Sequence, residues 1–432
     1  MDSMKKRLLS RETPIKVGVA GAGEFSIELI SQVSRITNME ISVVTDIDVQ
    51  QGIIAFKLAG YSHDDIIVAE TFSQAAAALE KGKRVVCQDA MLMNKLPIDV
   101  VCDITGNPIF GAQFAYSAIE NRKHVIVVNI ESDVVVGSIL RRMADKAGVV
   151  YTEGDGDQPS LIKGLYDYAT ILGLEVTAAG KWTSTPADPD QPCNGKRSDR
   201  GYADGSKNQV EMCCVANMTG LLPDIRGLHL PARGLQDILS TLCPTHEGGI
   251  LSQDGVIEAI NCVDHSTGKV VEPLLGGGIF IVVKTDNPYA KHAIRYKGFV
   301  HNNDYSRALL YRPYHFVGIE TPISIMKAVL YGEATGAVRE TPVADVVAVA
   351  KKDLLPGEML DGIGGLAVRG VVDKVSNTTG MLPLGLAENV TVKDFVPRGT
   401  ILAYDMLTSE GTDFIWKLRK IQDTYTGFAK SL

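Results

Sequence analysis

Between Ile15 and Thr152 the chain alternates short apolar runs with longer amphipathic stretches. The apolar runs predict strands at Ile15–Ala20, Glu40–Val44, Val85–Cys87, Val100–Ile104, His124–Val128 and Val149–Thr152. Helical spacing in the stretches between them predicts helices at Ser26–Ile36, Asp48–Leu58, Phe72–Lys81, Ile109–Asn121 and Gly137–Ala147. Because strands that alternate with helices are typical of a parallel sheet covered on both faces, the expected fold class is α/β, with a doubly wound Rossmann sheet.

The pattern changes twice beyond this region. A Pro-, Asp- and Gly-rich stretch from Thr185 to Gly205 predicts a loop or flap, Val210–Thr219 predicts a helix, and Gly278–Lys284 and Ile294–Phe299 predict antiparallel strands. From Pro342 onward, short strands punctuated by Pro-Gly and Pro-Arg-Gly turns predict a small β-rich module. We therefore expect a dinucleotide-binding Rossmann domain at 1–152, an α+β substrate domain at 153–338, and a β-rich module with a C-terminal helix at 339–432.

A glycine turn follows the first predicted strand. The segment Lys16-Val-Gly-Val-Ala-Gly-Ala-Gly-Glu-Phe-Ser26 passes from a strand through a turn into a helix, the context in which such glycines indicate a dinucleotide site. Gly21 makes the turn, and Gly23 lets the backbone approach a pyrophosphate. The amides as far as Glu24 and Phe25, at the start of the helix, supply the anion site. Ser26 replaces the third glycine of the strict motif but is small enough for close packing.

Two further features point to a nicotinamide cofactor. Asp46 follows the second predicted strand, where its carboxylate can accept hydrogen bonds from ribose hydroxyls and would repel a 2′-phosphate. NAD is therefore favoured over NADP. Thr105 and Gly106 follow the strand Val100–Ile104 and are expected to line the nicotinamide pocket; an ordinary left-handed turn is the alternative interpretation.

Composition narrows the classes of partner. The formal net charge of −8 and the absence of a long Lys or Arg run do not favour nucleic acid. The seven cysteines form no CxxC pair, so we expect reduced thiols in a cytoplasmic protein and no zinc site. No signal-peptide core and no apolar run near about 18 residues is present, so no membrane partner is expected. A small-molecule substrate and a homo-oligomer are expected.

With these motifs in view, the chain resembles the homoserine-dehydrogenase-like oxidoreductases that carry a C-terminal SAF domain, a family that includes the 1-deoxy-D-xylulose 5-phosphate reductoisomerase-like enzymes. The segments that carry the resemblance are Gly21-Ala-Gly-Glu24, Asp103-Ile-Thr-Gly106, His124-Val-Ile-Val-Val-Asn-Ile-Glu-Ser-Asp133, Gly154-Asp-Gly-Asp-Gln-Pro-Ser160, Ala179-Gly-Lys181, Val210-Glu-Met212, Ala216-Asn-Met-Thr-Gly220, Leu222-Pro-Asp224, Arg312-Pro-Tyr-His315, Lys351-Lys-Asp353 and Pro356-Gly-Glu358. The resemblance implies a Rossmann domain, a substrate domain with a mixed sheet, and a SAF module.

The sequence departs from this family in places that bear on activity. The reductoisomerase-like members use NADPH and are basic after the second strand, whereas this chain has Asp46 and Asp48 there. They also carry a second lysine where this chain has Trp182 after Lys181. Homoserine dehydrogenases end the fifth strand in a lysine, and here that position is Asn129, which we expect to contact the cofactor.

Hydride transfer to or from a carbonyl needs a group that exchanges the alcohol proton. Lys181 follows an apolar strand and is the candidate general acid/base; a surface lysine at a strand end is the alternative. Asp155 and Asp157 lie on a glycine loop after the last Rossmann strand, where they are expected to orient Lys181 or to bind substrate hydroxyls. Their spacing lacks the ligands of a calcium loop, so no metal site is assigned.

Polar residues on otherwise apolar segments are candidates for substrate binding. Glu131 is expected to point into the cleft, with a solvated loop as the alternative. Asn217 and Thr219 follow a predicted buried helix, and Arg312 can pair with an anionic substrate group through two hydrogen bonds. His315 completes the set, although a structural histidine is the alternative there.

Three functions follow from these features. The leading hypothesis is an NAD-dependent dehydrogenase or reductase that acts on a small polar hydroxy or oxo compound, derived from a sugar or a hydroxy acid. The second is a 1-deoxy-D-xylulose 5-phosphate reductoisomerase-like enzyme, and a divalent metal is expected only in that case. The third is a non-catalytic sensor of NAD(H), for which Lys181→Ala would leave every property unchanged.

Overall fold

The computed structural model describes residues 2–185, 189–190, 197–273 and 275–428. The chain forms two compact units, Met1–Ser160 with Phe316–Glu340, and Leu161–His315 with Thr341–Leu432. This grouping differs from the predicted domain boundaries. Phe316–Glu340, predicted to belong to the substrate domain, returns to the first unit because Ile325 and Ala328 are buried in its hydrophobic core. The C-terminal residues share a unit with the substrate sheet.

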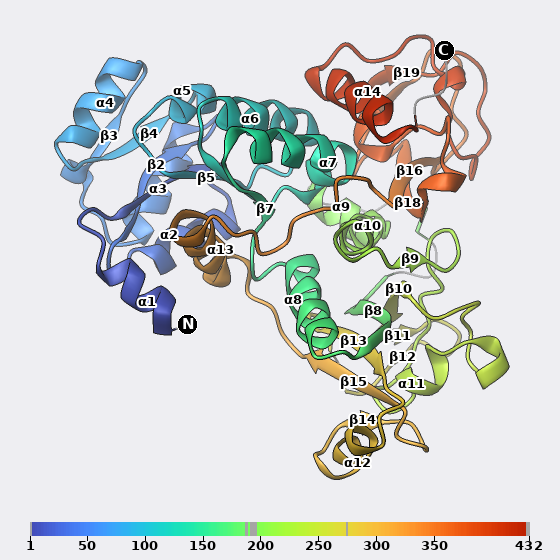
Figure 1. Cartoon of the computed structure of the whole chain (residues 1–432). Helices are drawn as coiled ribbons and strands as arrows, with labels where there is room; N and C mark the ends of the chain where they lie inside the picture. The colour runs from blue at the N-terminus through green and yellow to red at the C-terminus, as the bar shows by residue number, and fades with distance from the viewer. Residues whose placement is uncertain (1, 186–188, 191–196, 274, 429–432) are drawn as a thin grey trace. The chain divides into compact units, whose positions relative to one another are not determined.

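The first unit is a parallel α/β structure (Figure 1). Its elements are α1 (Asp2–Leu9), β1 (Ile15–Ala20), α2 (Glu24–Val33), β2 (Met39–Thr45), α3 (Val49–Leu58), β3 (Ile66–Val68), α4 (Phe72–Glu80), β4 (Arg84–Cys87), α5 (Ala90–Asn94), β5 (Val100–Asp103), α6 (Pro108–Glu120), β6 (His124–Val127), α7 (Ile130–Ala147), β7 (Tyr151–Glu153) and α13 (Val317–Tyr331). The strand order is β3-β4-β2-β1-β5-β6-β7, and every pairing is parallel. The predicted Rossmann sheet is therefore confirmed, with the short edge strand β3 added.

The sheet is apolar on both faces because helices cover both. Val17 and Val19 of β1 and Val44 of β2 are fully buried in a core that also takes residues of α2, α3 and α13. Figure 1 shows α5, α6 and α7 on the other side of the sheet. Burial of this kind produces the continuous apolar runs from which the strands were predicted.

The second unit contains a mixed sheet. Helix α8 (Gln158–Ile171) leads into it, followed by β8 (Glu175–Thr183), α9 (Arg197–Ala203), α10 (Ser206–Thr219), β9 (Leu222–Pro223), α11 (Ile238–Thr241), β10 (Val256–Asn261), β11 (Val263–Asp264), β12 (Lys269–Val270), β13 (Ile279–Lys284), α12 (Pro288–Tyr296), β14 (Val300–His301) and β15 (Arg307–Arg312). The main sheet has the order β14-β15-β13-β8-β10-β9. Strands β8 and β10 are parallel, whereas β13 is antiparallel to both of its neighbours. The predicted α+β character of the middle region is confirmed.

Two local predictions in this unit were wrong. Ile294–Phe299 was predicted as a strand, but Ile294 lies in helix α12, which is capped by the Asn287 side chain and has Pro288 at its first position. An Asn-Pro start of this kind favours a helix over a strand. The predicted flap from Thr185 to Gly205 contains helix α9, and part of the flap lies outside the described residues.

The C-terminal β module, residues 341–432, carries β16 (Ala344–Ala350), β17 (Met359–Asp361), β18 (Val368–Lys374), β19 (Glu388–Thr391) and α14 (Phe414–Thr426). β16 pairs with β18 and β17 with β19, both antiparallel. The amides of Leu354 and Val396 each donate to the other's carbonyl, at 2.8 and 3.0 Å. These bonds join the turn that contains Pro356 to the turn that contains Pro397. The prediction of a β-rich module is confirmed, and its assignment as a SAF domain stays a prediction.

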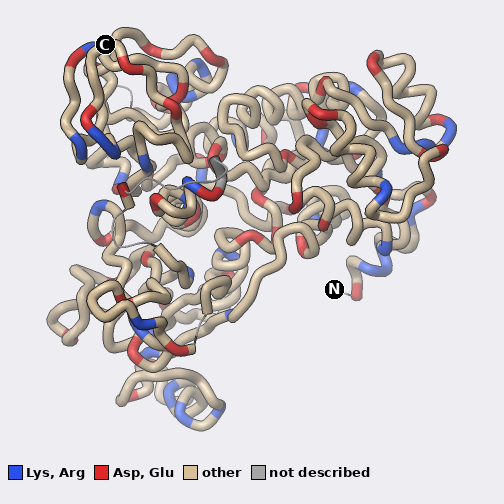
Figure 2. Tube along the Cα trace, turned by 180° about the vertical axis from the view of Figure 1, so that it is seen from behind, with Lys and Arg blue, Asp and Glu red and all other residues tan. Residues whose placement is uncertain are grey.

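Charges are mixed along the chain. Figure 2 shows Lys and Arg interspersed with Asp and Glu over the traced residues. Within the described residues, no helix has the length and apolar content needed to cross a membrane.

Candidate functional site

The glycine turn lies between β1 and α2. Gly21 has a φ of +92°, and its amide donates to Thr45 O at 2.8 Å, which ties the turn to the end of β2. A Cβ at this position would lie 3.0 Å from Ile104 O, so both the conformation and the close approach require glycine. Ser26 is fully buried and donates its hydroxyl to Gly21 O at 2.7 Å. The serine therefore fastens the helix to the turn, a role that a third glycine could not fill.

Gly23 has a different environment. It is the N-cap of α2, with φ −75° and ψ −170°, and a Cβ at this position would meet no atom within 4 Å. Glu24 and Phe25 form the first turn of the helix, and Phe25 is 44% exposed. The first amides of an α-helix have no partner within the helix and carry its positive dipole end. Open space above this turn can accept an anion such as a pyrophosphate.

Asp46 faces the glycine turn. Its Oδ2 accepts from the Ala22 amide at 2.7 Å, and its Oδ1 accepts from the Asp48 amide at 2.9 Å. Asp48 points to a different group, because its side chain caps α3 through the Gln50 amide. A carboxylate is thus fixed beside the turn, at the position that the sequence predicted for the adenosine ribose.

These residues fit a dinucleotide. The turn at Gly21, the open helix start at Gly23 and the carboxylate of Asp46 are brought together at the carboxyl ends of β1 and β2. In open α/β sheets ligands bind at this edge.

The end of β5 carries a buried polar network. Asp103 Oδ1 accepts from the Thr105 amide at 3.1 Å and from its hydroxyl at 2.7 Å. Asn129 Nδ2 lies 3.0 Å from Asp103 Oδ2, 3.2 Å from Thr105 Oγ1 and 2.8 Å from Asn107 O, as a donor to all three. Gly106 has a φ of +66°, so the left-handed turn left open by the sequence is present. The network holds Thr105, whose Cα would lie 3.4 Å from a Cβ at Gly21.

Burial raises the pKa of Asp103. The residue is 1% exposed, and this burial raises its pKa to about 6, although hydrogen bonds from Thr105 and Asn129 act in the opposite direction. A Cβ at Gly111 would lie 2.6 Å from Asp103 Oδ2 and 2.5 Å from Asn129 Nδ2, so the cluster depends on that glycine. Asp103 therefore holds its neighbours in place from a site that water does not reach.

The acidic residues beyond Asn129 lie in a helix. α7 begins at Ile130, seven residues before the predicted start at Gly137, so Glu131 and Asp133 are in its first turn and the solvated-loop interpretation is wrong. Asp133 is 3% exposed, and this burial raises its pKa to about 6. Negative charges are favourable near a helix N-terminus, which offsets part of the cost of burying them.

The loop after β7 holds Asp155 and Asp157. The Asp155 amide donates to Ser324 Oγ at 2.6 Å, and Thr321 Oγ1 donates to Asp155 O at 3.2 Å. Asp157 is buried, and its Oδ1 accepts from the amide of Gln158, the first residue of α8, at 2.8 Å. Helix α13, which returns from far along the chain, therefore shapes this loop.

Lys181 is the most informative of the predicted catalytic residues. It lies on β8, and its ammonium pairs with the Glu211 carboxylate of α10. The two side chains are 5% and 4% exposed, so the pair is almost completely desolvated. The interpretation of Lys181 as a surface lysine is therefore wrong. A buried pair of this kind can hold or release a proton at a defined position.

The predicted substrate-binding residues of the second unit each contact a group other than Lys181, although Arg312 is aligned with Lys181 across the sheet through Ile279 of β13. Asn217 is bound to backbone groups of the C-terminal β module. Thr219 donates to Val215 O at 2.7 Å, within its own helix. Arg312 lies over the Tyr314 ring, 4.4 Å from its centroid, and the His315 Nδ1 lies 2.7 Å from Gly277 O. Their roles in substrate binding stay predictions.

Sequence reasoning missed two residues that organise these sites. Glu211, the partner of Lys181, was quoted only as part of a motif, and its signal was a lone carboxylate on an otherwise apolar helical stretch. Asp103 was passed over in the same way, because an acidic residue at the end of a strand predicts neither burial nor the two side chains that bind it.

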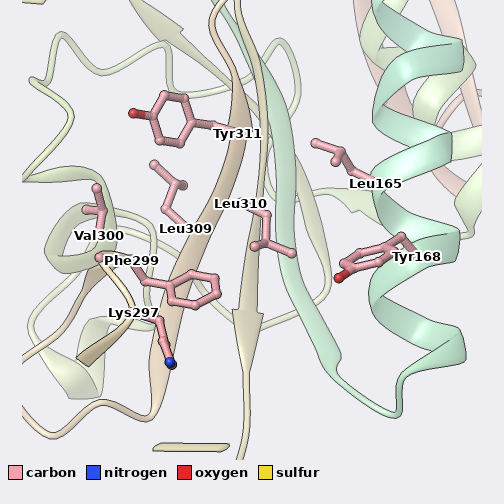
Figure 3. A pocket seen from close by; sticks show the side chains of 9 residues that line it. Leu165, Tyr168, Lys297, Phe299, Val300, Leu309, Leu310 and Tyr311 are labelled. Atoms are coloured by element: carbon pink, nitrogen blue, oxygen red, sulfur yellow. The ribbon is translucent and has the colours of Figure 1, made fainter. Parts of the chain in front are cut away.

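A separate pocket of about 300 Å³ lies at the edge of the mixed sheet, between α8 and β15. Figure 3 shows Leu165 and Tyr168 projecting from α8 on the side of Leu310. Its lining is mainly apolar and comprises Leu165, Tyr168, Lys297, Gly298, Phe299, Val300, Leu309, Leu310 and Tyr311. None of the predicted site residues is among them.

Comparison with known protein families finds a match for part of the chain. Residues 156–321 match the family described as oxidoreductase DRL, catalytic domain. No curated protein sequence matches the chain significantly. The apo scyllo-inositol dehydrogenase from Lactobacillus casei shares 15% identity, over 76% of this chain and 91% of that one, with a TM-score of 0.39. A 3-ketoreductase from Actinomadura kijaniata, in complex with TDP-benzene and NADP, shares 12% identity over 74% and 91%, with a TM-score of 0.38.

At these TM-scores the structural likeness carries no argument about function. The family match does, and together with the Rossmann sheet and its glycine turn it makes this chain an NAD(P)-dependent oxidoreductase. The predicted enzyme class is thereby confirmed. The homoserine-dehydrogenase-like assignment stays a prediction.

Proposed function

We propose that this protein prefers NAD and transfers a hydride between the cofactor and a small polar hydroxy or oxo compound, derived from a sugar or a hydroxy acid. The observation that carries the proposal is the Asp46 carboxylate, fixed 2.7 Å from the Ala22 amide of the glycine turn. A negative charge at this place favours ribose hydroxyls and opposes a 2′-phosphate.

The cofactor, when bound, supplies the hydride acceptor or donor. Gly21, Gly23 and the first turn of α2 would hold its pyrophosphate, and Asp46 its adenosine ribose. Thr105, which is bound by Asp103 and Asn129, and Gly106 after it would line the nicotinamide pocket.

Lys181 exchanges the proton in this proposal. When the substrate is an alcohol, its carbon loses a hydride and its hydroxyl loses a proton, and a carbonyl forms. Lys181 accepts that proton as the amine; in the opposite direction it donates the proton to the carbonyl oxygen as the ammonium. Glu211 directs the ammonium, because the pair is buried and a carboxylate accepts only at fixed positions.

Cofactor preference provides the first test. Calorimetric titration of the wild type with NAD and NADP should give at least tenfold tighter binding of NAD. Asp46→Asn keeps an acceptor for the Ala22 amide but removes the charge, and it should reduce the preference to near parity. Asp48→Asn is the matched control, since Asp48 caps α3 and should leave the preference unchanged. Equal affinities in the wild type would contradict the proposal.

A substrate panel provides the second test. Polyols, sugar acids and hydroxy acids are offered with each cofactor, and reduction of the nicotinamide is followed by absorbance. Lys181→Met should lower turnover at least about a hundredfold, the size of a general acid/base contribution. Including 1-deoxy-D-xylulose 5-phosphate, with and without Mg²⁺, tests the reductoisomerase alternative. Cofactor binding without turnover on any compound would favour the sensor.

A further inference from the structure

Helix α10 is buried along almost its whole length. From residue 206 to 219 every residue is buried except Lys207, which is half-buried. The helix packs against β8 and β10 of the mixed sheet and also against β16 and β18 of the C-terminal β module. An element that is buried on all sides is positioned by everything that it contacts.

One face of α10 makes polar contacts with β8, the strand that carries Lys181. Glu211 pairs with Lys181 on β8. One turn earlier, Asn208 Oδ1 accepts from Thr183 Oγ1 at 2.9 Å, and its Nδ2 donates to Thr185 Oγ1 at 2.8 Å. Residues three apart lie on the same side of a helix, so this face follows the end of β8.

Another face of α10 accepts hydrogen bonds from backbone amides at the edge of β18. Ser206 Oγ accepts from the Gly370 amide at 2.8 Å, and Gln209 Oε1 accepts from the Val372 amide at 2.9 Å. On its other side β18 pairs with β16, so these amides belong to an edge that has no neighbouring strand among the described residues. Side chains three residues apart on α10 therefore bind amides two residues apart on β18, at the edge where another strand would otherwise pair.

Both ends of the helix are fastened to the same module. Lys351 and Asp204 form an ion pair at 2.9 Å, with side chains 6% and 2% exposed, and Asp204 Oδ1 also accepts from the Ser206 amide at the start of α10. At the far end Asn217 Oδ1 accepts from the Val343 and Ala344 amides at 2.8 and 3.0 Å.

We infer that the C-terminal β module sets the position of α10 and, through it, the position of Glu211 against Lys181. Gln209, Ser206 and Lys351 are then positioning residues for proton exchange, although none of them touches the substrate. The inference rests on the proposed role of Lys181. A displacement of about 1 Å at a reacting group can lower the rate about a hundredfold.

Gln209→Met tests this inference, because it removes the acceptor of the Val372 amide and keeps the length of the side chain. It should lower kcat at least tenfold and shift a limb of the pH profile of kcat, measured with the best substrate of the panel above. The dissociation constant of NAD should stay within twofold, since the glycine turn is in the first unit. Ser206→Ala removes a single hydroxyl and should act in the same direction if Gln209→Met does not fold.

Thr378→Val is the matched control. It removes a buried hydrogen bond of the same module, from Thr378 Oγ1 to Val375 O at 3.1 Å, without a bond to α10. It should leave kcat and the pH profile unchanged. The inference is overturned if Gln209→Met and Ser206→Ala keep the wild-type kcat and pH profile while Lys181→Met abolishes turnover. If Lys181→Met keeps turnover, the proposed function itself is wrong.

Discussion

Removing one charge of the Lys181–Glu211 pair should destabilise the second unit far more than removing both. Each side chain is about 95% buried, so Lys181→Met leaves a carboxylate without its counter-charge, and Glu211→Leu leaves an ammonium. Breaking a buried pair in this way costs roughly 3–5 kcal/mol, whereas replacing both partners by apolar side chains of similar size is often close to neutral. The double variant should therefore be more stable than either single variant by at least about 2 kcal/mol.

The assay is equilibrium unfolding in urea followed by tryptophan fluorescence. The chain has two tryptophans, and both Trp182 and Trp416 are buried in the second unit, so the signal reports that unit alone. The pH dependence adds a sign test. Protonation neutralises a Glu211 carboxylate that has lost its counter-charge, so Lys181→Met should be less destabilising in acid than in base. Glu211→Leu should be less destabilising in base than in acid.

A double variant that loses as much stability as the sum of the two single variants would refute this reasoning. Additivity of that kind is expected only when two residues do not interact. Identical pH dependence of the two single variants would also contradict it, because no stranded charge would then be present.

Three further predictions concern the first unit, and circular dichroism is the suitable measure of its unfolding. Asp103 has a pKa of about 6 in the fold against an ordinary value of 3.8, so its contribution to stability is present in acid and is lost as the pH rises from about 4 to about 6. Relative to Asp103→Asn, the free energy of unfolding of the wild type should fall by about 1.4 kcal/mol between about pH 5 and pH 8. A constant difference would show that Asp103 is ionised throughout. Gly23→Ala should leave stability nearly unchanged but weaken NAD binding at least tenfold. Gly21→Ala should destabilise the unit by more than about 1 kcal/mol, because Gly21 has a positive φ. Equal stabilities of the two variants would contradict this prediction. Ser324→Ala removes the acceptor of the Asp155 amide and should lower turnover while NAD affinity is kept; unchanged turnover would show that this loop takes no part.

The cofactor half of the protein could be predicted from the sequence because its signals are local. The strand, the turn at Gly21 and the helix start follow each other directly, and Asp46 comes at the end of the next strand. Parallel strands buried on both faces leave uninterrupted apolar runs, so the sheet could be predicted along with its chemistry. The boundary of α7 was missed because Glu131 and Asp133 look like loop residues until the helix dipole and the burial of Asp133 are known.

The second unit depends on contacts that sequence spacing does not encode. Lys181 and Glu211 are 30 residues apart, and Lys351 binds Asp204 across 147. The same holds in the first unit for helix α13, where Ser324 binds the Asp155 amide across 169 residues of sequence. Ile294–Phe299 was predicted as a strand, although the Asn287-Pro288 pair before it carried the stronger signal for a helix.

The buried pair of Lys181 and Glu211 is difficult to explain by stability alone. A well-packed apolar pair would hold α10 against β8 at equal or lower cost, because desolvation consumes most of what two charges gain from each other. The polar bonds of Asn208, Gln209 and Asn217 already fix the register of the helix on both sides. Under the proposed function, the ion pair adds an ammonium that exchanges a proton, in the position that we infer the C-terminal β module controls. The separation of stability from turnover in the single and double variants is therefore the most informative measurement on this protein.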